Sequence, residues 1–194
     1  MPIRTDEVIP APAADLCLTF ANTRYWRGMA SPTEELQSPD DVLRWAAKAG
    51  HLSAAMMRRF ERSATLLQEA IEVRETVHHC FATVAAGRTP VEKELGALNA
   101  ALTAAPPRQR VRINGWEVGC PQPGITTLLA PVLWSAADLL VGPQVSCVRQ
   151  CANPACGWLF LDTSKGGNRR WCSMSACGNR AKAHRHYMRH KDAE

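Results

Sequence analysis

The stretch CANPACGWLFLDTSKGGNRRWCSMSAC, residues 151–177, decides how the last part of the chain folds. Its four cysteines form two C-x4-C pairs separated by fifteen residues, Cys151 with Cys156 and Cys172 with Cys177. A tetrahedral zinc site is typically built from two such pairs, because each pair supplies two corners and the loop brings the pairs together. The spacing therefore predicts a structural Zn²⁺ held by these four thiolates.

The composition of this stretch also favours a metal over a hydrophobic core. A segment this poor in large apolar side chains does not fold by burial alone, and metal binding worth on the order of 10 kcal/mol supplies the missing free energy. Two disulfides or four free thiols are the alternative, which a reducing compartment disfavours. Cys147 and His184 are alternative ligands in less symmetric arrangements.

Turn and strand signals surround the cysteines. Asn153-Pro154 predicts a turn within the first pair, and WLFLD (158–162) predicts a strand leading away from it. Gly166-Gly167-Asn168 predicts a second turn, after which RRWC (169–172) returns as the partner strand. The sequence GNRAKAHRHYMRHK (178–191) has helix-compatible spacing. We therefore expect a β-hairpin followed by a helix.

The charge of the chain is concentrated in the same region. Residues 1–148 carry 14 Lys and Arg against 15 Asp and Glu, whereas residues 149–194 carry 9 against 3. Four thiolates and one Zn²⁺ contribute −2, so the formal +6 of the tail becomes about +4 when metal is bound. A basic appendage on a near-neutral body indicates a polyanionic partner, although a solvated basic helix is the simpler alternative. The candidate nucleic-acid contacts are Lys165, Arg169, Arg170, Asn179, Arg180, Lys182, Arg185 and Arg189.

Upstream, most of the chain has helical patterns. SPDDVLRWAAKAG (38–50) predicts a helix capped by Ser38, and apolar residues recur at helical spacing over 53–84, in one helix or two joined by a kink. TPVE (89–92) has the form of a capping box for a helix that ends before Pro106-Pro107. ITTLLAPVLWSAADLLV (125–141) predicts an apolar helix that starts near Thr127 or is kinked at Pro131.

Two segments of the body have strand patterns. DLCLTFANT (15–23) alternates apolar and other residues with period two, which predicts a half-buried strand. VRINGWEV (111–118) places Asn114-Gly115 between two short alternating runs, which predicts a tight hairpin. The fold class is therefore mainly α with small antiparallel β elements. We expect a helical N-terminal domain over 1–143 and a small four-cysteine zinc finger over 144–194.

The body carries few catalytic signals. It has no glycine-rich phosphate loop, nucleophile elbow or HExxH pair, so we expect no enzyme, and we assign no catalytic or organic-cofactor-binding residue. His78-His79 is interpreted as solvated or as satisfied hydrogen-bond partners. Asp15 and Asn22 either line a pocket or, in the simpler reading, make turn hydrogen bonds. The chain has eight cysteines, of which four are the predicted ligands and one is Cys147. The other three, Cys17, Cys80 and Cys120, stand apart and are interpreted as small buried side chains.

No membrane or export segment is apparent. No apolar run approaches the ~20 residues that a membrane-spanning helix needs. MPIRTDEVIPAPAADLC (1–17) lacks the charged-then-apolar layout of a signal peptide. We therefore expect a cytoplasmic protein with no membrane partner.

The residues around the last cysteines resemble a known family. LFLDTS, RRWCSMSACGNR and the basic run after them are similar to the CGNR zinc finger, named for the motif at Cys177–Arg180. In that family the finger follows a mainly helical domain called ABATE, described as a stress-induced transcription regulator. LCLTFANTR looks like the early Asn-Thr motif of that domain, with Cys17 and Thr19 where other members carry different residues, and DDVLRWAAKAG is similar to its helix.

The resemblance implies a transcription regulator that binds DNA through its C-terminal zinc module. It leaves Asn22-Thr23 as a candidate pocket or turn element, and a small-molecule effector or a homodimer as open roles for the N-terminal domain. Two other readings remain: a zinc-stapled module that binds protein or RNA without sequence-specific DNA recognition, and an enzyme with a pocket in the helical body. Zinc alone does not separate the first two readings, because both need it.

Overall fold

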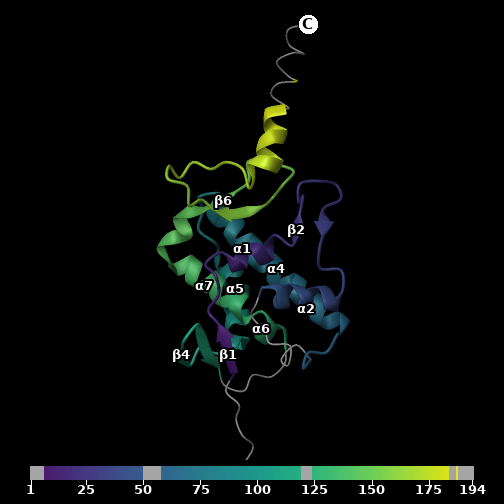
Figure 1. Ribbon diagram of the computed structural model, residues 1–194, viewed down its shortest axis with the longest axis vertical. Helices are drawn as coiled ribbons and strands as arrows, with labels where there is room; N and C mark the ends of the chain where they lie inside the picture. The colour runs from purple at the N-terminus through teal and green to yellow at the C-terminus, as the bar shows by residue number, and fades with distance from the viewer. Residues whose placement is uncertain (1–6, 50–57, 119–123, 184–186, 188–194) are drawn as a thin grey trace, which may run out of the picture.

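The computed structural model describes residues 7–49, 58–118, 124–183 and 187, and their longest helix is α4 (Ala64–Ala85) (Figure 1). The helix begins where Ser63 is extended and its hydroxyl accepts the N–H of Leu66 at 3.1 Å, which satisfies one free donor of the first turn. The prediction of helix from residue 53 is wrong over 58–63, which form a turn and loop. Residues 53–57 lie outside the described part.

The helix predicted after Ser38 is confirmed as α2 (Pro39–Lys48). The Ser38 hydroxyl accepts the N–H of Asp41 at 3.3 Å and donates to the carboxylate of the same residue at 2.7 Å. Val42 and Leu43 are buried on the face that packs against α4. The predicted stop at Gly50 lies outside the described residues.

Helix α5 (Glu92–Ala104) packs against α4 and ends before Pro106, as predicted. Its capping residue differs from the prediction, because Glu94, not Glu92, turns back toward the preceding chain. The Glu94 carboxylate accepts the N–H of Val91 at 2.9 Å and the hydroxyl of Thr83 at 3.0 Å. The second bond ties the start of α5 to α4, which a local capping pattern does not reveal.

The apolar segment after residue 124 forms two helices, α6 (Ile125–Leu128) and α7 (Ala130–Val141). They break at Leu129 because Pro131 lacks an N–H and fits only near the start of a helix, which confirms the predicted interruption. Helix α7 ends at Gly142 and is followed by the short 3-10 helix η1 (Pro143–Cys147).

The strand predicted over 15–23 is wrong, because this segment contains the helix α1 (Leu16–Ala21). Only Thr19 within it is exposed, and α1 is packed against both α4 and α7. The apparent alternation depended on counting Cys17 as a polar position, but Cys17 is fully buried and its N–H donates to the Ser135 hydroxyl at 3.1 Å. A helix buried on nearly all sides has no polar stripe from which its period can be read.

The predicted hairpin is confirmed as β4 (Arg110–Arg112) and β5 (Gly115–Val118), which pair antiparallel. Its turn lies one residue earlier than predicted, at Ile113-Asn114, with Asn114 at φ 68°. Gly115 instead belongs to β5, where it faces a third strand, β1 (Glu7–Pro10). A Cβ on Gly115 would lie 2.5 Å from the Ile9 carbonyl oxygen, so the close pairing of β1 and β5 requires glycine there.

A short ribbon follows α1 and was not predicted. It consists of β2 (Arg24–Tyr25) and β3 (Thr33–Glu34), and we call residues 24–34 the arm. The arm is fixed to α4 by the fully buried Arg74, whose guanidinium binds the carboxylates of Glu34 and Glu75. A buried arginine of this kind holds two segments in one arrangement, because its charge has to be paired.

The last part of the chain contains β6 (Val148–Gln150), β7 (Leu159–Leu161) and the π-helical turn η2 (Met174–Gly178), which continues as helix over 179–183. We call residues 144–183 the finger and residues 7–143 the body. The predicted strand at 158–162 is confirmed, but its partner is β6, and RRWC (169–172) forms no strand. The segment 162–172 is instead held by side chains, as described below.

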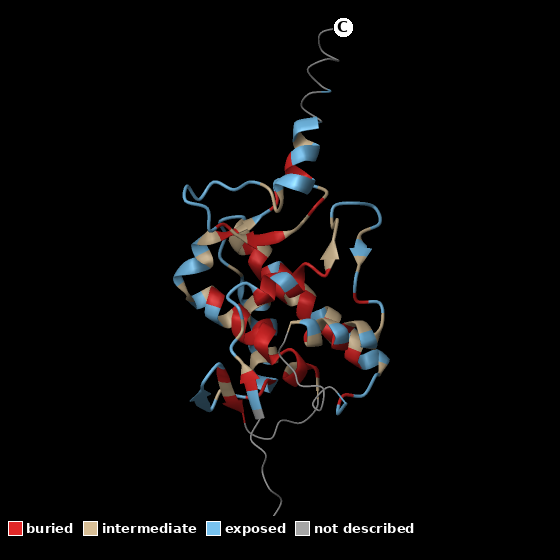
Figure 2. Ribbon diagram, viewed as in Figure 1, coloured by how far each residue is buried: buried red, intermediate tan, exposed pale blue. Residues whose placement is uncertain are grey.

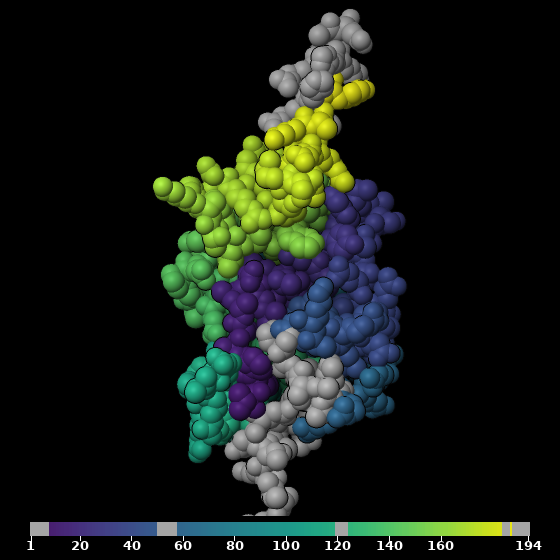
Figure 3. Space-filling model, in the orientation of Figure 1, coloured from purple at the N-terminus to yellow at the C-terminus, as the bar shows by residue number. Residues whose placement is uncertain are grey.

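The structure confirms a mainly helical chain with small antiparallel sheets and a C-terminal four-cysteine site. Val148 and Leu159 of the finger belong to the same buried cluster as residues from the helices of the body. Figure 2 shows buried segments, in red, in the finger as well as in the helices of the body. Figure 3 shows the green and yellow finger lying directly against the purple N-terminal segment. The division of the chain near residue 143 stays a prediction, but the two parts share a hydrophobic core. None of the helices in the described residues is long and apolar enough to cross a membrane.

Candidate metal centre and nucleic-acid interface

The structure brings the four predicted cysteines together. The sulfur atoms of Cys151, Cys156, Cys172 and Cys177 all lie within 4.8 Å of one another, and we call this group the cysteine cluster. The alternative ligand Cys147 lies in η1 and is not part of the cluster, and His184 lies outside the described residues. The seven described cysteines are all free, so the disulfide alternative is not supported.

The donor set of the cysteine cluster fits Zn²⁺. Tetrahedral zinc with Zn–S bonds of about 2.3 Å places its sulfur atoms roughly 3.8 Å apart, and the Cys156 and Cys172 sulfurs lie 3.7 Å apart. Burial raises the pKa of Cys156 to about 12, so a bound metal has to displace protons from the thiols. Zinc does so readily, because it stabilises thiolates as ligands.

Asn153 organises the loop of the first pair. Its side-chain oxygen accepts the N–H of Ala155 at 3.1 Å, its carbonyl accepts the N–H of Cys156 at 2.9 Å, and its amide donates to the Cys177 sulfur at 3.5 Å. Burial opposes ionisation of Cys177, but the hydrogen bonds from Asn153 and the neighbouring thiols outweigh it and lower the pKa of this thiol. The predicted turn thus also supports the second cysteine pair.

Asp162 shapes the loop that leads to the second pair. This buried carboxylate accepts from the hydroxyl and N–H of Ser164 and, at 2.8 Å, from the N–H of Arg169. The Ser164 hydrogen bond lowers the pKa of Asp162. The Arg169 guanidinium then donates to the carbonyls of Trp171 and Cys172 and lies 4.4 Å above the ring of Phe160. These hydrogen bonds take the place of the predicted second strand.

The finger is attached to the body by a side chain that mimics a strand. The Asn22 amide donates to the Leu159 carbonyl at 2.8 Å, and its oxygen accepts the Leu159 N–H at 2.9 Å. Asn22 is buried, so both polar atoms of its side chain are satisfied by Leu159 rather than by water. We predicted that Asn22 lines a pocket or makes turn hydrogen bonds. Its side chain instead joins the body to the finger.

The arm makes a second attachment, at the cysteine cluster itself. The N–H groups of Arg27 and Gly28 donate to the carbonyls of Cys156 and Ala155, each at 3.3 Å. Trp26 packs against the cluster. A Cβ on Gly28 would lie 2.1 Å from the Pro154 carbonyl oxygen, so only glycine permits this approach. Sequence reasoning missed these residues, because no local pattern links them to a site more than a hundred residues away.

His78 makes a third attachment, where α4 passes under the finger. Its Nε2 lies 3.2 Å from the carbonyl oxygen of Gly157. Burial lowers the pKa of His78 to about 4, and the Arg27 cation acts in the same direction. His78 is therefore a neutral, satisfied hydrogen-bond partner, one of the two roles predicted for this pair. The neighbouring His79 is exposed.

Acidification is expected to destabilise the protein through His78, which faces Arg27, Glu75 and His79. Its folded pKa of about 4 lies below the ordinary value of 6.5, so the unfolded chain binds the proton first. This contribution to stability is complete above pH 6.5 and is lost as the pH falls toward 4. Between pH 7 and pH 4.5 the loss is about 2–3 kcal/mol.

Urea unfolding at both pH values measures this effect. The His78→Gln variant should lose most of the difference between the two free energies of unfolding, whereas the exposed-site control His79→Gln should keep it. Zinc content, measured at both pH values, separates this effect from acid release of the metal. An unchanged pH dependence in His78→Gln at constant zinc content would contradict the prediction.

The predicted nucleic-acid contacts differ in how they are placed. Lys165, Arg170 and Lys182 are exposed, and Arg180 is exposed with its guanidinium 4.4 Å from the Trp26 ring centre. Asn179 donates to the Ser175 carbonyl at 3.4 Å, within its own turn. Arg169 is engaged by the finger, as described above. Arg185 and Arg189 lie outside the described residues.

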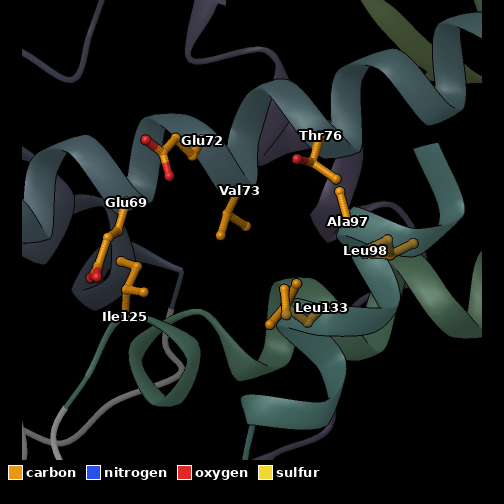
Figure 4. Close-up of a pocket in the computed structure, with 9 residues that line it drawn as sticks. Glu69, Glu72, Val73, Thr76, Ala97, Leu98, Ile125 and Leu133 are labelled. Carbon is orange, nitrogen blue, oxygen red and sulfur yellow. The ribbon is translucent and has the colours of Figure 1, made fainter. Parts of the chain in front are cut away.

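The remaining isolated cysteines and a pocket belong to the body. Cys17 and Cys80 are fully buried, as predicted, and burial raises the pKa of Cys17 to about 12. Cys120 lies outside the described residues. A pocket of about 250 Å³ lies between α4, α5 and the segment of α6 and α7, with Val73 and Leu133 pointing toward each other across it (Figure 4).

The fold and the site together define a zinc-finger protein in which a four-cysteine module is packed onto a helical body. Comparison with known families agrees with this class. The model of the ABATE family, described as "Putative stress-induced transcription regulator", matches residues 14–143, and that of the CGNR zinc finger matches residues 148–190. The chain belongs to the ABATE family and carries a CGNR zinc finger, as its resemblance implied. No curated protein matches the chain.

Proposed function

We propose that this protein is a transcription regulator that binds duplex DNA through its finger. The observation that carries the proposal is a contrast between the arginines of the two parts. In the body, Arg27, Arg44, Arg62, Arg74 and Arg108 are each paired with a carboxylate.

In the finger, the exposed cations differ from these arginines. Within the described residues no ion pair engages Lys165, Arg170, Arg180 or Lys182. Arg170 and Arg180 contact aromatic rings, which leave their charge uncompensated. Unpaired cations gathered beside a rigid metal site suit a phosphate backbone, which is bound mainly through such contacts.

Binding to duplex DNA is expected to weaken steeply with salt. If the tail neutralises about five phosphates, the logarithm of the affinity falls with the logarithm of the salt concentration at a slope of about −4 to −5. The double variant Arg170→Ala/Arg180→Ala should reduce the steepness by about 2. Fluorescence anisotropy of a labelled duplex at several salt concentrations measures both slopes.

The control for this titration is Arg44→Ala, which removes the same kind of charge from the body. Arg44 is exposed and paired with Asp41 on α2, so its loss should leave the slope unchanged. Two results would contradict DNA binding through the finger. One is an affinity of the unmodified protein that does not depend on salt concentration, and the other is a salt dependence that is the same in the double variant.

The alternative is a zinc-stapled module that binds protein or RNA without sequence-specific DNA recognition. Both proposals need zinc, but they differ in the ligand. Competition of RNA against duplex DNA, followed by selection of bound duplexes from a random pool, distinguishes them. Regularly spaced half-sites in the selected DNA would also indicate binding as a dimer.

We also propose that the body binds a small-molecule effector or forms a homodimer, and that it is not catalytic. We expect the protein to act in the cytoplasm and to have no membrane partner. The pocket in Figure 4 is the place for a small-molecule effector, because apolar side chains line it beside Glu69 and Glu72. Strand β4 lies at the edge of its sheet, with Val111 exposed on the strand and Ile113 exposed in the adjoining turn, which suits pairing with a second copy.

A further inference from the structure

The finger has a groove beside the cysteine cluster. It has a volume of about 420 Å³ and lies between the loop of the first cysteine pair, the segment before Cys172 and the helix that follows Cys177. Its lining consists of Ala152, Asn153, Pro154, Arg170, Trp171, Cys177, Arg180 and Ala181. This volume is typical of sites that enclose a small organic group.

The chemistry of the groove is apolar with positive charge. Trp171, Pro154 and Ala181 offer apolar surface, and the lining has no acidic side chain. Arg170 and Arg180 supply the two charges, and Arg170 lies 5.4 Å from the ring centre of Trp171. The amide of Asn153 is already bonded within the finger, so it does not set the identity of an occupant.

A groove of this kind matches one component of nucleic acid in particular. The edge of a stacked base pair is recessed within the duplex and does not reach into a hollow on a protein, whereas an unstacked base protrudes. An aromatic face binds such a base by stacking, while neighbouring arginines hold the phosphates beside it. The uncompensated charges of the groove favour this occupant over an apolar protein side chain.

We propose that the groove lined by Trp171, Arg170 and Arg180 binds an unpaired DNA base. This deepens the DNA-binding function proposed above and rests on it. Trp171 supplies the stacking surface, and the two arginines bind the phosphates on either side of the base. The finger then recognises DNA by an exposed base as well as by its backbone charge.

The test compares two labelled duplexes that differ only in one bulged, unpaired adenine. The protein should bind the bulged duplex about tenfold more tightly, an effect typical of one base stacked on an aromatic side chain. Trp171→Leu should abolish this preference and keep the affinity for the intact duplex. Trp158→Leu is the matched control, because Trp158 also packs against the cysteine cluster but does not line the groove.

A second pair of variants tests the groove independently, in case Trp171→Leu does not fold. Ala181→Leu fills the groove from the helix and should remove the preference, whereas Ala183→Leu, two residues along, lies outside the lining and should preserve it. One zinc per chain confirms that each variant is folded at the finger. Equal affinity for both duplexes, or a preference that survives Ala181→Leu, overturns the inference and leaves duplex binding intact. Failure to bind either duplex overturns both proposals.

Discussion

Serine in place of Cys172 is expected to remove zinc and unfold the finger, the largest effect of any single substitution in this chain. Cys172 sits at the end of the 162–172 segment and supplies one corner of the cysteine cluster. Zinc binding to four thiolates is worth on the order of 10 kcal/mol, and serine is a poor replacement for a thiolate ligand. Metal analysis should return well below one zinc per chain.

The control for this substitution is Cys147→Ser. Cys147 lies four residues before Cys151 but outside the cysteine cluster, so this variant should keep its metal and its fold. Limited proteolysis should cut the Cys172→Ser protein within the finger and leave the control intact. A Cys172→Ser protein that retains one zinc and resists proteolysis would show that another residue completes the site.

Alanine in place of Asn22 is expected to give the second largest effect, by separating the finger from the body. The substitution removes both hydrogen bonds to Leu159 and leaves a buried N–H and a buried carbonyl without partners. Each unsatisfied group costs roughly 1–3 kcal/mol, so the free energy of unfolding should fall by about 3–4 kcal/mol. Denaturant unfolding monitored by circular dichroism measures the change.

This effect differs from loss of metal, and zinc content separates the two. All four ligands lie in the finger, so Asn22→Ala should still bind one zinc per chain while unfolding at lower denaturant concentration. Asn179→Ala is the control, because Asn179 is exposed and, among the described residues, its side chain bonds only within its own turn. Equal stability of the two variants would mean that the core shared by the two parts, not Asn22, holds the finger in place.

The parts of the fold that the sequence predicted correctly are those fixed by neighbouring residues. The cysteine cluster spans 27 residues and its assembly follows from their spacing alone, and the start of α2 follows from Ser38 and Pro39. The break before Pro131 likewise follows from the missing N–H of proline. In each case the physical cause acts within a few turns of the chain or a single loop.

The errors have a common cause in contacts between distant residues. The strand predicted over 15–23 is wrong because α4 and α7 bury nearly all sides of helix α1. The strand predicted for RRWC (169–172) is wrong because Asp162 and the guanidinium of Arg169 fix this segment instead. The same bonds reduce the availability of Arg169 for phosphate, which the count of charges did not reveal.

The bond between Asn22 and Leu159 also bears on the order in which the protein is assembled during synthesis. The two residues are 137 positions apart, so the ribosome completes the whole body before it makes the partner of Asn22. Until then the Asn22 amide and the N–H groups of Arg27 and Gly28 are without their final acceptors. Because the finger is expected to fold only with zinc bound, the arm is expected to reach its final packing only after the metal is loaded. A shortage of zinc during synthesis would therefore leave the defect in both parts of the molecule.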